Sequence, residues 1–167
     1  MIVDYSTPPD VGSRYIDELH FHHSAGSELD TIAQVTAGAM SRGDKHFAGD
    51  PYNFHVWRPP DDPEIPLDAN KWIVEYGRPA HLKPASIEGR NTHALAVVVH
   101  GRWDTQPLPL DAQERLVDVL AWLCRSFDIP VSRVFGHRER DTPGHTVCPG
   151  YDPEVIRRAL AQRLSSG

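Results

Sequence analysis

The sequence predicts an α/β domain in which a central mixed β-sheet is flanked by about three helices. Short apolar strand candidates alternate along the chain with amphipathic helical segments, an order that is typical of this class. One candidate, 94–99, is a near-continuous apolar run, as expected of a strand buried on both faces. The chain is long enough to form one hydrophobic core, and we expect a single domain over 1–167 with 1–14 as an N-terminal extension.

The first strand candidate covers 15–23 and carries histidines on one of its two faces. Leu19 and Phe21 share one face, and His20 and His22 alternate with them. Successive residues of a strand point to opposite sides of a sheet. We therefore expect a strand that is buried through its apolar face and ends in side chains able to bind a ligand.

A helix is expected next, because apolar residues recur at helical spacing. Ser27 or Asp30 is the candidate for its N-terminal cap, and Gly43 is expected to end it after about Arg42. The apolar stripe consists of Ile32, Val35, Ala39 and Met40.

Two further strands and two loops precede the central strand. The strands are expected over 52–58 and 71–76. The segment 59–70 contains four prolines and four acidic residues, which is typical of a surface loop. The segment 78–91 is expected to be mostly irregular.

Two helices and a short strand are expected in the last third of the chain. Asp111 and Glu114 have the spacing of a capping box, and the helix that follows is expected to run to Phe127. The segment 131–135 is expected to form a short strand. Asp152 is the expected cap of the last helix, which has a proline in its first turn.

Composition excludes several classes of partner. The net charge of −6 makes nucleic acid an unsuitable main ligand. No apolar run approaches the roughly 20 residues of a membrane-spanning helix, so no membrane insertion is expected. The first ten residues carry acids and prolines rather than a signal sequence. We expect a monomer that is made in the cytoplasm.

Three residues from opposite ends of the chain form a candidate zinc site. His22, His137 and Cys148 combine two imidazoles with a thiolate, and zinc accepts both nitrogen and sulfur. Three protein ligands leave one tetrahedral position open, as in catalytic zinc sites. Spacing alone leaves His23 and His145 open as alternative ligands.

Four short segments, taken in order, carry a resemblance to a known family. They are 21–26 (Phe-His-His-Ser-Ala-Gly), 51–54 (Pro-Tyr-Asn-Phe), 91–97 (Asn-Thr-His-Ala-Leu-Ala-Val), and 136–138 (Gly-His-Arg) followed by 148–150 (Cys-Pro-Gly). Together they resemble the zinc-dependent N-acetylmuramoyl-L-alanine amidases, which include phage amidase lysozymes and catalytic peptidoglycan recognition proteins. The resemblance covers nearly the whole chain and implies the amidase fold of the peptidoglycan recognition proteins.

The resemblance also implies roles for individual residues. His22, His137 and Cys148 match the three zinc ligands of the family. Tyr52 matches the family's active-site tyrosine, and Thr146 matches a residue two positions before the cysteine that assists it. Tyr52 as a packing aromatic and Thr146 as a turn residue are the alternatives that the residues alone leave open.

The chain departs from the family pattern at three places. The loop between His137 and Cys148 is about three residues longer than in lysozyme-like members, which keeps His145 as a possible substitute ligand. Asn53 stands where the family usually has a histidine. The segment 96–98 stands where some relatives have a Gly-Ile-Glu sequence with a glutamate base, so the chain resembles the branch that uses the tyrosine.

The implied activity is zinc-dependent hydrolysis of the amide bond between N-acetylmuramic acid and L-alanine in peptidoglycan. The partner is then a glycan strand with its stem peptide, and a phage or prophage endolysin that reaches the cell wall after release fits best. Three alternatives remain: a non-catalytic peptidoglycan-binding module, a cytoplasmic amidase that recycles muropeptides, and a closed structural zinc domain with His23 or His145 as fourth ligand.

Overall fold

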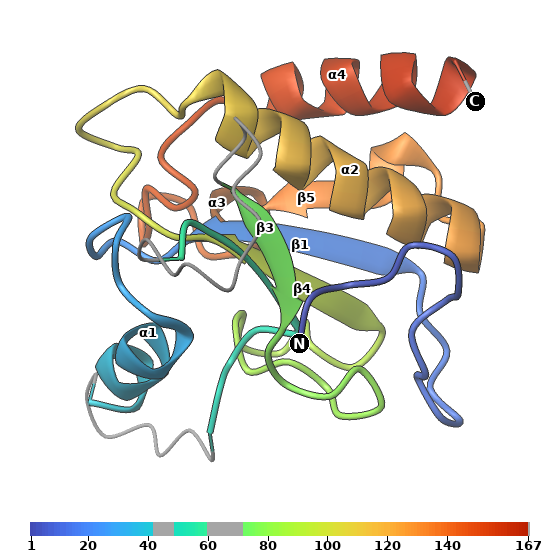
Figure 1. Cartoon of the computed structure of the whole chain (residues 1–167), viewed down its shortest axis with the longest axis horizontal. Coiled ribbons are helices and arrows are strands. Elements are labelled where there is room, and N and C mark those ends of the chain that lie inside the picture. The colour runs from blue at the N-terminus through green and yellow to red at the C-terminus, as the bar shows by residue number, and fades with distance from the viewer. Residues whose placement is uncertain (42–48, 60–71, 167) are drawn as a thin grey trace.

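The computed structural model describes residues 1–41, 49–59 and 72–166 (Figure 1). Most of the predicted loop over 59–70, together with the predicted end of the first helix at Arg42 and Gly43, lies outside the described residues. None of the described helices is long and apolar enough to span a membrane.

Five strands form one mixed sheet, as predicted. They are β1 (Glu18–His23), β2 (Phe54–Trp57), β3 (Ile73–Tyr76), β4 (Ala94–Val99) and β5 (Val134–Gly136). Their order across the sheet is β3-β2-β4-β1-β5. Only β3 pairs antiparallel to its neighbour, whereas β2, β4, β1 and β5 run parallel. The apolar run of β4 occupies the centre, where all six of its residues are buried.

Helices cover both faces of this sheet. The helices are α1 (Ile32–Met40), α2 (Leu110–Phe127), the single turn α3 (His137–Arg140) and α4 (Pro153–Ser165). Figure 1 shows α2 and α4 packed side by side on one side of the sheet and α1 on the other. The main core lies between α2 and the sheet. A smaller cluster on the α1 side consists of Val35, Tyr52, Ala96 and Val98.

The alternation predicted for the first strand is confirmed. Leu19 and Phe21 are fully buried in the main core, so His20 and His22 face the opposite side of the sheet. Both histidines are also buried, at 0% and 1% exposure. The strand begins at Glu18, three residues later than predicted.

The predicted cap of the first helix is wrong. Thr31 caps α1, and its hydroxyl accepts a hydrogen bond from the backbone of Gln34 while the Gln34 side chain accepts one from the backbone of Thr31. Asp30 is engaged elsewhere. Its carboxylate accepts from the Ser27 backbone at 2.8 Å, and its carbonyl accepts from the His100 ring at 2.7 Å.

The predicted capping box of the second helix is also wrong. The helix α2 begins at Leu110 with Pro109 as its cap residue, and the Pro109 carbonyl accepts the first helical hydrogen bond. Asp111 therefore lies in the first turn, where its carboxylate binds the backbone N–H of Ala112 at 3.0 Å. Leu116, Val119, Leu120 and Leu123 of this helix are buried, and Asp152 caps α4 as predicted.

The strand predicted over 131–135 is shorter than expected and is followed by a helical turn that was not predicted. Residues Val131–Arg133 form a 3-10 turn, and β5 follows it. The turn α3 begins at His137, directly after β5. The Glu139 carboxylate accepts the Gly136 N–H at 2.8 Å, which fixes the start of this turn.

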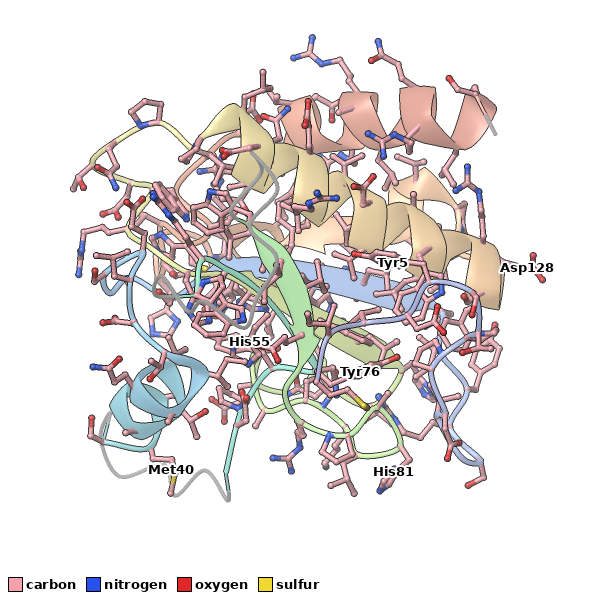
Figure 2. All side chains as sticks on the ribbon, viewed as in Figure 1. Tyr5, Met40, His55, Tyr76, His81 and Asp128 are labelled. Carbon is pink, nitrogen blue, oxygen red and sulfur yellow. The ribbon has the colours of Figure 1, made fainter. Side chains whose placement is uncertain are left out.

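The N-terminal segment packs on β3 and α2. Ile2 forms an antiparallel bridge with Glu75, Val3 is buried in the main core, and the Tyr5 ring lies 5.4 Å from that of Trp122. Figure 2 shows Tyr5 beside α2.

Candidate metal centre

Sheet register brings the two predicted histidine ligands together. The strands β1 and β5 are parallel neighbours in which Phe21 pairs with Gly136. His22 and His137 each follow one member of this pair, so both lie at the carboxyl ends of adjacent strands. Their ring centroids are 4.8 Å apart. Ligand sites commonly form at this edge of α/β sheets.

Cys148 completes the cluster from the loop that precedes α4. Its sulfur lies 3.7 Å from His22 Nδ1. One ligand atom from each of His22, His137 and Cys148 lies within 4.8 Å of the others, and this is the one such group among the described residues. The backbone N–H of His23 donates to the Cys148 sulfur at 3.4 Å, which stabilises negative charge there.

Burial keeps the two histidines of this cluster in the neutral form that binds metals. Burial lowers the pKa of His22 well below its usual value, and the nearby His137 lowers it further. Burial also lowers the pKa of His137, although Asp141 acts in the opposite direction. The neutral imidazole is the metal ligand, so neither ring must lose a proton at neutral pH.

The donor set fits zinc. The His22 nitrogen that faces the Cys148 sulfur is Nδ1, at 3.7 Å, so it is placed to share a metal ion with the thiolate. Two imidazole nitrogens and one thiolate are a donor set that zinc accepts, with room for a fourth ligand.

The two alternative ligands, His23 and His145, contact groups outside the three-residue cluster. His23 Nδ1 accepts a hydrogen bond from the Trp103 backbone at 3.2 Å and lies 3.8 Å from the Asp104 carboxylate. His145 Nδ1 lies 2.9 Å from Asp141 Oδ2, and its side chain is 70% exposed. Neither histidine belongs to the three-residue cluster.

Asp141 is a residue that sequence reasoning missed. Its Oδ2 lies 3.2 Å from His137 Nε2 as well as 2.9 Å from His145 Nδ1. A histidine that binds a metal through one nitrogen commonly donates its other N–H to a carboxylate, which fixes the ring. The available signal was its position four residues after His137 in a segment able to form a helical turn.

Replacing Asp141 with alanine should lower the zinc affinity of the protein by about 10- to 100-fold, because the His137 ring then loses its orienting acceptor. Competition with a chromophoric chelator measures this affinity. Asp141→Asn is the matched control, since its amide oxygen can still accept from His137 Nε2, and its affinity should stay closer to that of the wild type. Equal affinity in the alanine variant and the wild type would show that Asp141 does not position His137.

An ion pair holds the α3 turn against β1. Arg140 in α3 donates from Nε to Glu18 Oε1 at 2.9 Å, and Glu18 also lies 2.8 Å from His20 Nε2. Glu18 is almost fully buried, and a buried carboxylate needs such partners. This contact fixes the short helix that carries His137 to the strand that carries His22.

A cavity of about 720 Å³ opens beside the metal cluster. Tyr52 and Thr146, the two predicted helpers, line it together with His137 and Cys148. The Tyr52 ring lies 5.1 Å from that of His22. The Thr146 hydroxyl accepts the Cys148 backbone N–H at 3.1 Å, so Thr146 also shapes the turn that carries the cysteine.

Asn53 has a structural reason to stand where the family usually has histidine. Its side-chain oxygen accepts the Ala96 backbone N–H at 3.1 Å, and its amide nitrogen donates to the carbonyls of Arg78 and Leu82 at 3.2 and 3.3 Å. One amide can serve as acceptor and as double donor, which a neutral imidazole cannot. Asn53 thereby anchors the backbone next to Tyr52.

A buried pair of histidines lies behind Tyr52. His55 Nδ1 lies 2.8 Å from His100 Nε2, and His55 Nε2 lies 2.7 Å from Asp50 Oδ2. His100 Nδ1 donates to the Asp30 carbonyl at the start of α1. Burial lowers the pKa of His100 to about 3. Figure 2 labels His55, whose ring is 6.0 Å from Tyr52, so this chain of contacts supports the wall of the cavity.

Comparison with known proteins adds a family match. A family model described as N-acetylmuramoyl-L-alanine amidase matches residues 12–151. No match was found among curated proteins.

Similar solved structures include a bacterial amidase, a phage endolysin and a Drosophila protein. The N-acetylmuramoyl-L-alanine amidase LysC from Clostridium intestinale URNW has a TM-score of 0.70 at 17% identity, over 96% of this chain and 95% of that one. The endolysin of Thermus scotoductus MAT2119 bacteriophage Ph2119 has a TM-score of 0.67 at 16% identity, over 91% and 89%. A point mutant of Drosophila PGRP-LB, in complex with tracheal cytotoxin, has a TM-score of 0.60 at 16% identity, over 88% and 85%. At such identities the likeness shows the fold.

Proposed function

The chain belongs to the N-acetylmuramoyl-L-alanine amidase family, and we propose that it hydrolyses the amide bond between N-acetylmuramic acid and L-alanine in bacterial peptidoglycan. The observation that carries this proposal is the cluster of His22, His137 and Cys148 at the edge of a cavity of about 720 Å³. A metal-binding cluster that opens into a cavity is suited to catalysis, whereas a closed one is suited to structural support.

Zinc is the metal that this donor set favours, and His22, His137 and Cys148 would hold it. Zinc held by three protein ligands lowers the pKa of bound water and polarises a carbonyl group. The neutral imidazoles need not lose a proton before binding, and the His23 N–H supports the charge on the Cys148 sulfur.

Tyr52 and Thr146 supply the polar groups of the cavity next to this cluster. In the proposed reaction, the Tyr52 hydroxyl donates a hydrogen bond to the substrate oxygen on which negative charge develops. The Thr146 oxygen already accepts the Cys148 N–H, so its own hydroxyl hydrogen is directed to the substrate or to the leaving amine. Both roles match those implied by the sequence resemblance.

The proposed substrate is a glycan strand with its stem peptide. The fold likeness to Drosophila PGRP-LB, a structure determined with tracheal cytotoxin bound, supports a cavity of this kind. The likeness to the endolysin of bacteriophage Ph2119 supports a role as a phage or prophage endolysin that acts on the wall after release from the cytoplasm. We propose that 1–167 act as one catalytic domain.

Digestion of purified cell wall tests this function. The zinc-loaded protein should release stem peptides that begin with a free L-alanine amino group, and an excess of strong chelator should stop their release. Mass spectrometry identifies the new termini. If the zinc-loaded protein binds the wall but releases no such peptide, the chain is a recognition module and the proposed hydrolysis is wrong.

A further inference from the structure

A second cavity, of about 550 Å³, is lined by the N-terminal segment, α2 and Arg163 of α4. It shares no lining residue with the cavity beside the metal cluster. Trp122 lines it from α2 and packs on Phe54 of the main core, on the face of the sheet opposite to Tyr52. Tyr5 lines it from the N-terminal segment, beside α2 in Figure 2.

Arginines outnumber acids around this second cavity. Among the described residues, Arg115, Arg125 and Arg163 line it, with Asp118 as the one acidic residue. Asp118 forms ion pairs with two of these arginines, with Arg115 at 3.5 Å and with Arg163. Arg125 donates to the carbonyl of Arg163 at 3.0 Å and has no acidic partner in the described part of the chain. Three positive charges against one negative charge leave a local excess of two, in a chain whose net charge is −6.

Trp122, which lines this cavity, has an indole donor without an acceptor among the described residues. The indole nitrogen of Trp122 is buried and has no hydrogen-bond partner within residues 1–41, 49–59 and 72–166. Buried donors of this kind nearly always have a partner. The Tyr5 ring packs edge-on against Trp122 at 5.4 Å and is 40% exposed. The cavity therefore combines unmatched positive charge with an aromatic wall.

We propose that this cavity binds a phosphate group. Guanidinium groups donate to phosphate oxygens in a forked geometry and remain charged at every physiological pH. Phosphate is rich in acceptor oxygens, so it suits a site whose unmatched groups are donors. Any phosphate group is anionic at neutral pH, whether it is free or part of a polymer, so the local excess of positive charge attracts it.

A polymer of the cell wall that carries phosphate is the source we propose. The choice of this source, but not of the site, rests on the proposed function, since an amidase of peptidoglycan works among wall polymers. A phosphate site on the α2 face would hold the acidic protein on an anionic wall while the cavity beside the metal cluster stays open to the substrate.

Titration of inorganic phosphate into the intact protein tests the site, with calorimetry as the measurement. We expect saturable binding that Arg163→Gln weakens about tenfold or more, because a charge-assisted hydrogen bond is lost. Arg158→Gln is the matched control: it removes the same charge from an exposed position of the same helix that does not line the cavity. Binding in Arg158→Gln should equal that of the wild type.

Two outcomes of this titration would contradict the proposed phosphate site. One is the absence of saturable binding by the wild type. The other is an equal loss in Arg163→Gln and Arg158→Gln, which would reduce the effect to overall charge. Thermal unfolding of both variants checks that they fold as the wild type does.

Digestion of purified wall with and without its phosphate polymers tests whether such a polymer supplies the phosphate group. Arg163→Gln should bind and digest the polymer-bearing wall less well than the wild type, and should digest the stripped wall at the wild-type rate. Equal digestion of both walls by this variant and the wild type overturns the polymer as the source. A wild type that binds phosphate but releases no stem peptide from either wall would instead count against the proposed amidase function alone.

Discussion

Replacing Cys148 with serine should reduce the release of stem peptides from purified wall by about 10³-fold or more, since the zinc and the chemistry it supplies are lost together. Serine is close to cysteine in size, and Cys148 is 7% exposed, so the fold should persist. His22 and His137 remain as two ligands, too few for a stable catalytic site. Metal analysis after dialysis should find the variant free of zinc.

Cys124 is the matched control for this experiment. It is also buried, but it lies in α2 within the main core. Burial raises the pKa of the Cys124 thiol to about 12, so it stays protonated and unsuited to bind metal. Cys124→Ala should keep zinc content and activity. Full activity of Cys148→Ser, or of the metal-free wild type, would contradict the proposed role of the cluster.

Replacing Tyr52 with phenylalanine should lower kcat by about 10²-fold, the effect of losing one hydrogen-bond donor to a developing oxyanion. Zinc content should stay near one per chain, because Tyr52 is not a proposed ligand. The ring itself remains, and with it the packing against His22 and within the small cluster that contains Val35 and Val98. Turnover and metal content measured on the same preparation separate these effects.

Tyr15→Phe is the control for the tyrosine variant, since Tyr15 is 69% exposed and does not line the cavity. Its turnover should equal that of the wild type. Loss of zinc from Tyr52→Phe would mean that Tyr52 supports the metal cluster rather than the reaction. Unchanged turnover with zinc in place would exclude the proposed hydrogen bond.

Apolar patterns predicted the strands well, because the residues of a single strand show which of its faces are buried. The alternation of Leu19 and Phe21 with His20 and His22 is a property of one strand, and the apolar run 94–99 shows its central place directly. The same patterns do not state which strands are neighbours. The meeting of His22 with His137 depends on the pairing of β1 with β5, which only the family resemblance implied.

The predicted cap of the first helix is wrong because other groups occupy the polar atoms of Asp30. Asp30 has the chemistry of a helix cap, but Ser27 and His100 occupy its polar groups, so Thr31 caps α1 instead. His145, which the residues alone left open as an alternative ligand, contacts Asp141 four positions earlier in the chain. The contact between His100 and Asp30 joins residues that are far apart in the chain, so it depends on the assembled fold and cannot be predicted from local spacing.

The most direct test of the proposed metal centre is the structure of the zinc-loaded protein with anomalous diffraction at the zinc edge. We predict one strong anomalous peak bonded to His22, His137 and Cys148, with Zn–S near about 2.3 Å and Zn–N near about 2.0–2.1 Å, and an exchangeable fourth position facing the cavity that Tyr52 lines. A peak bonded to His145 or His23 in place of one of these residues, or a closed site with four protein ligands, would contradict it.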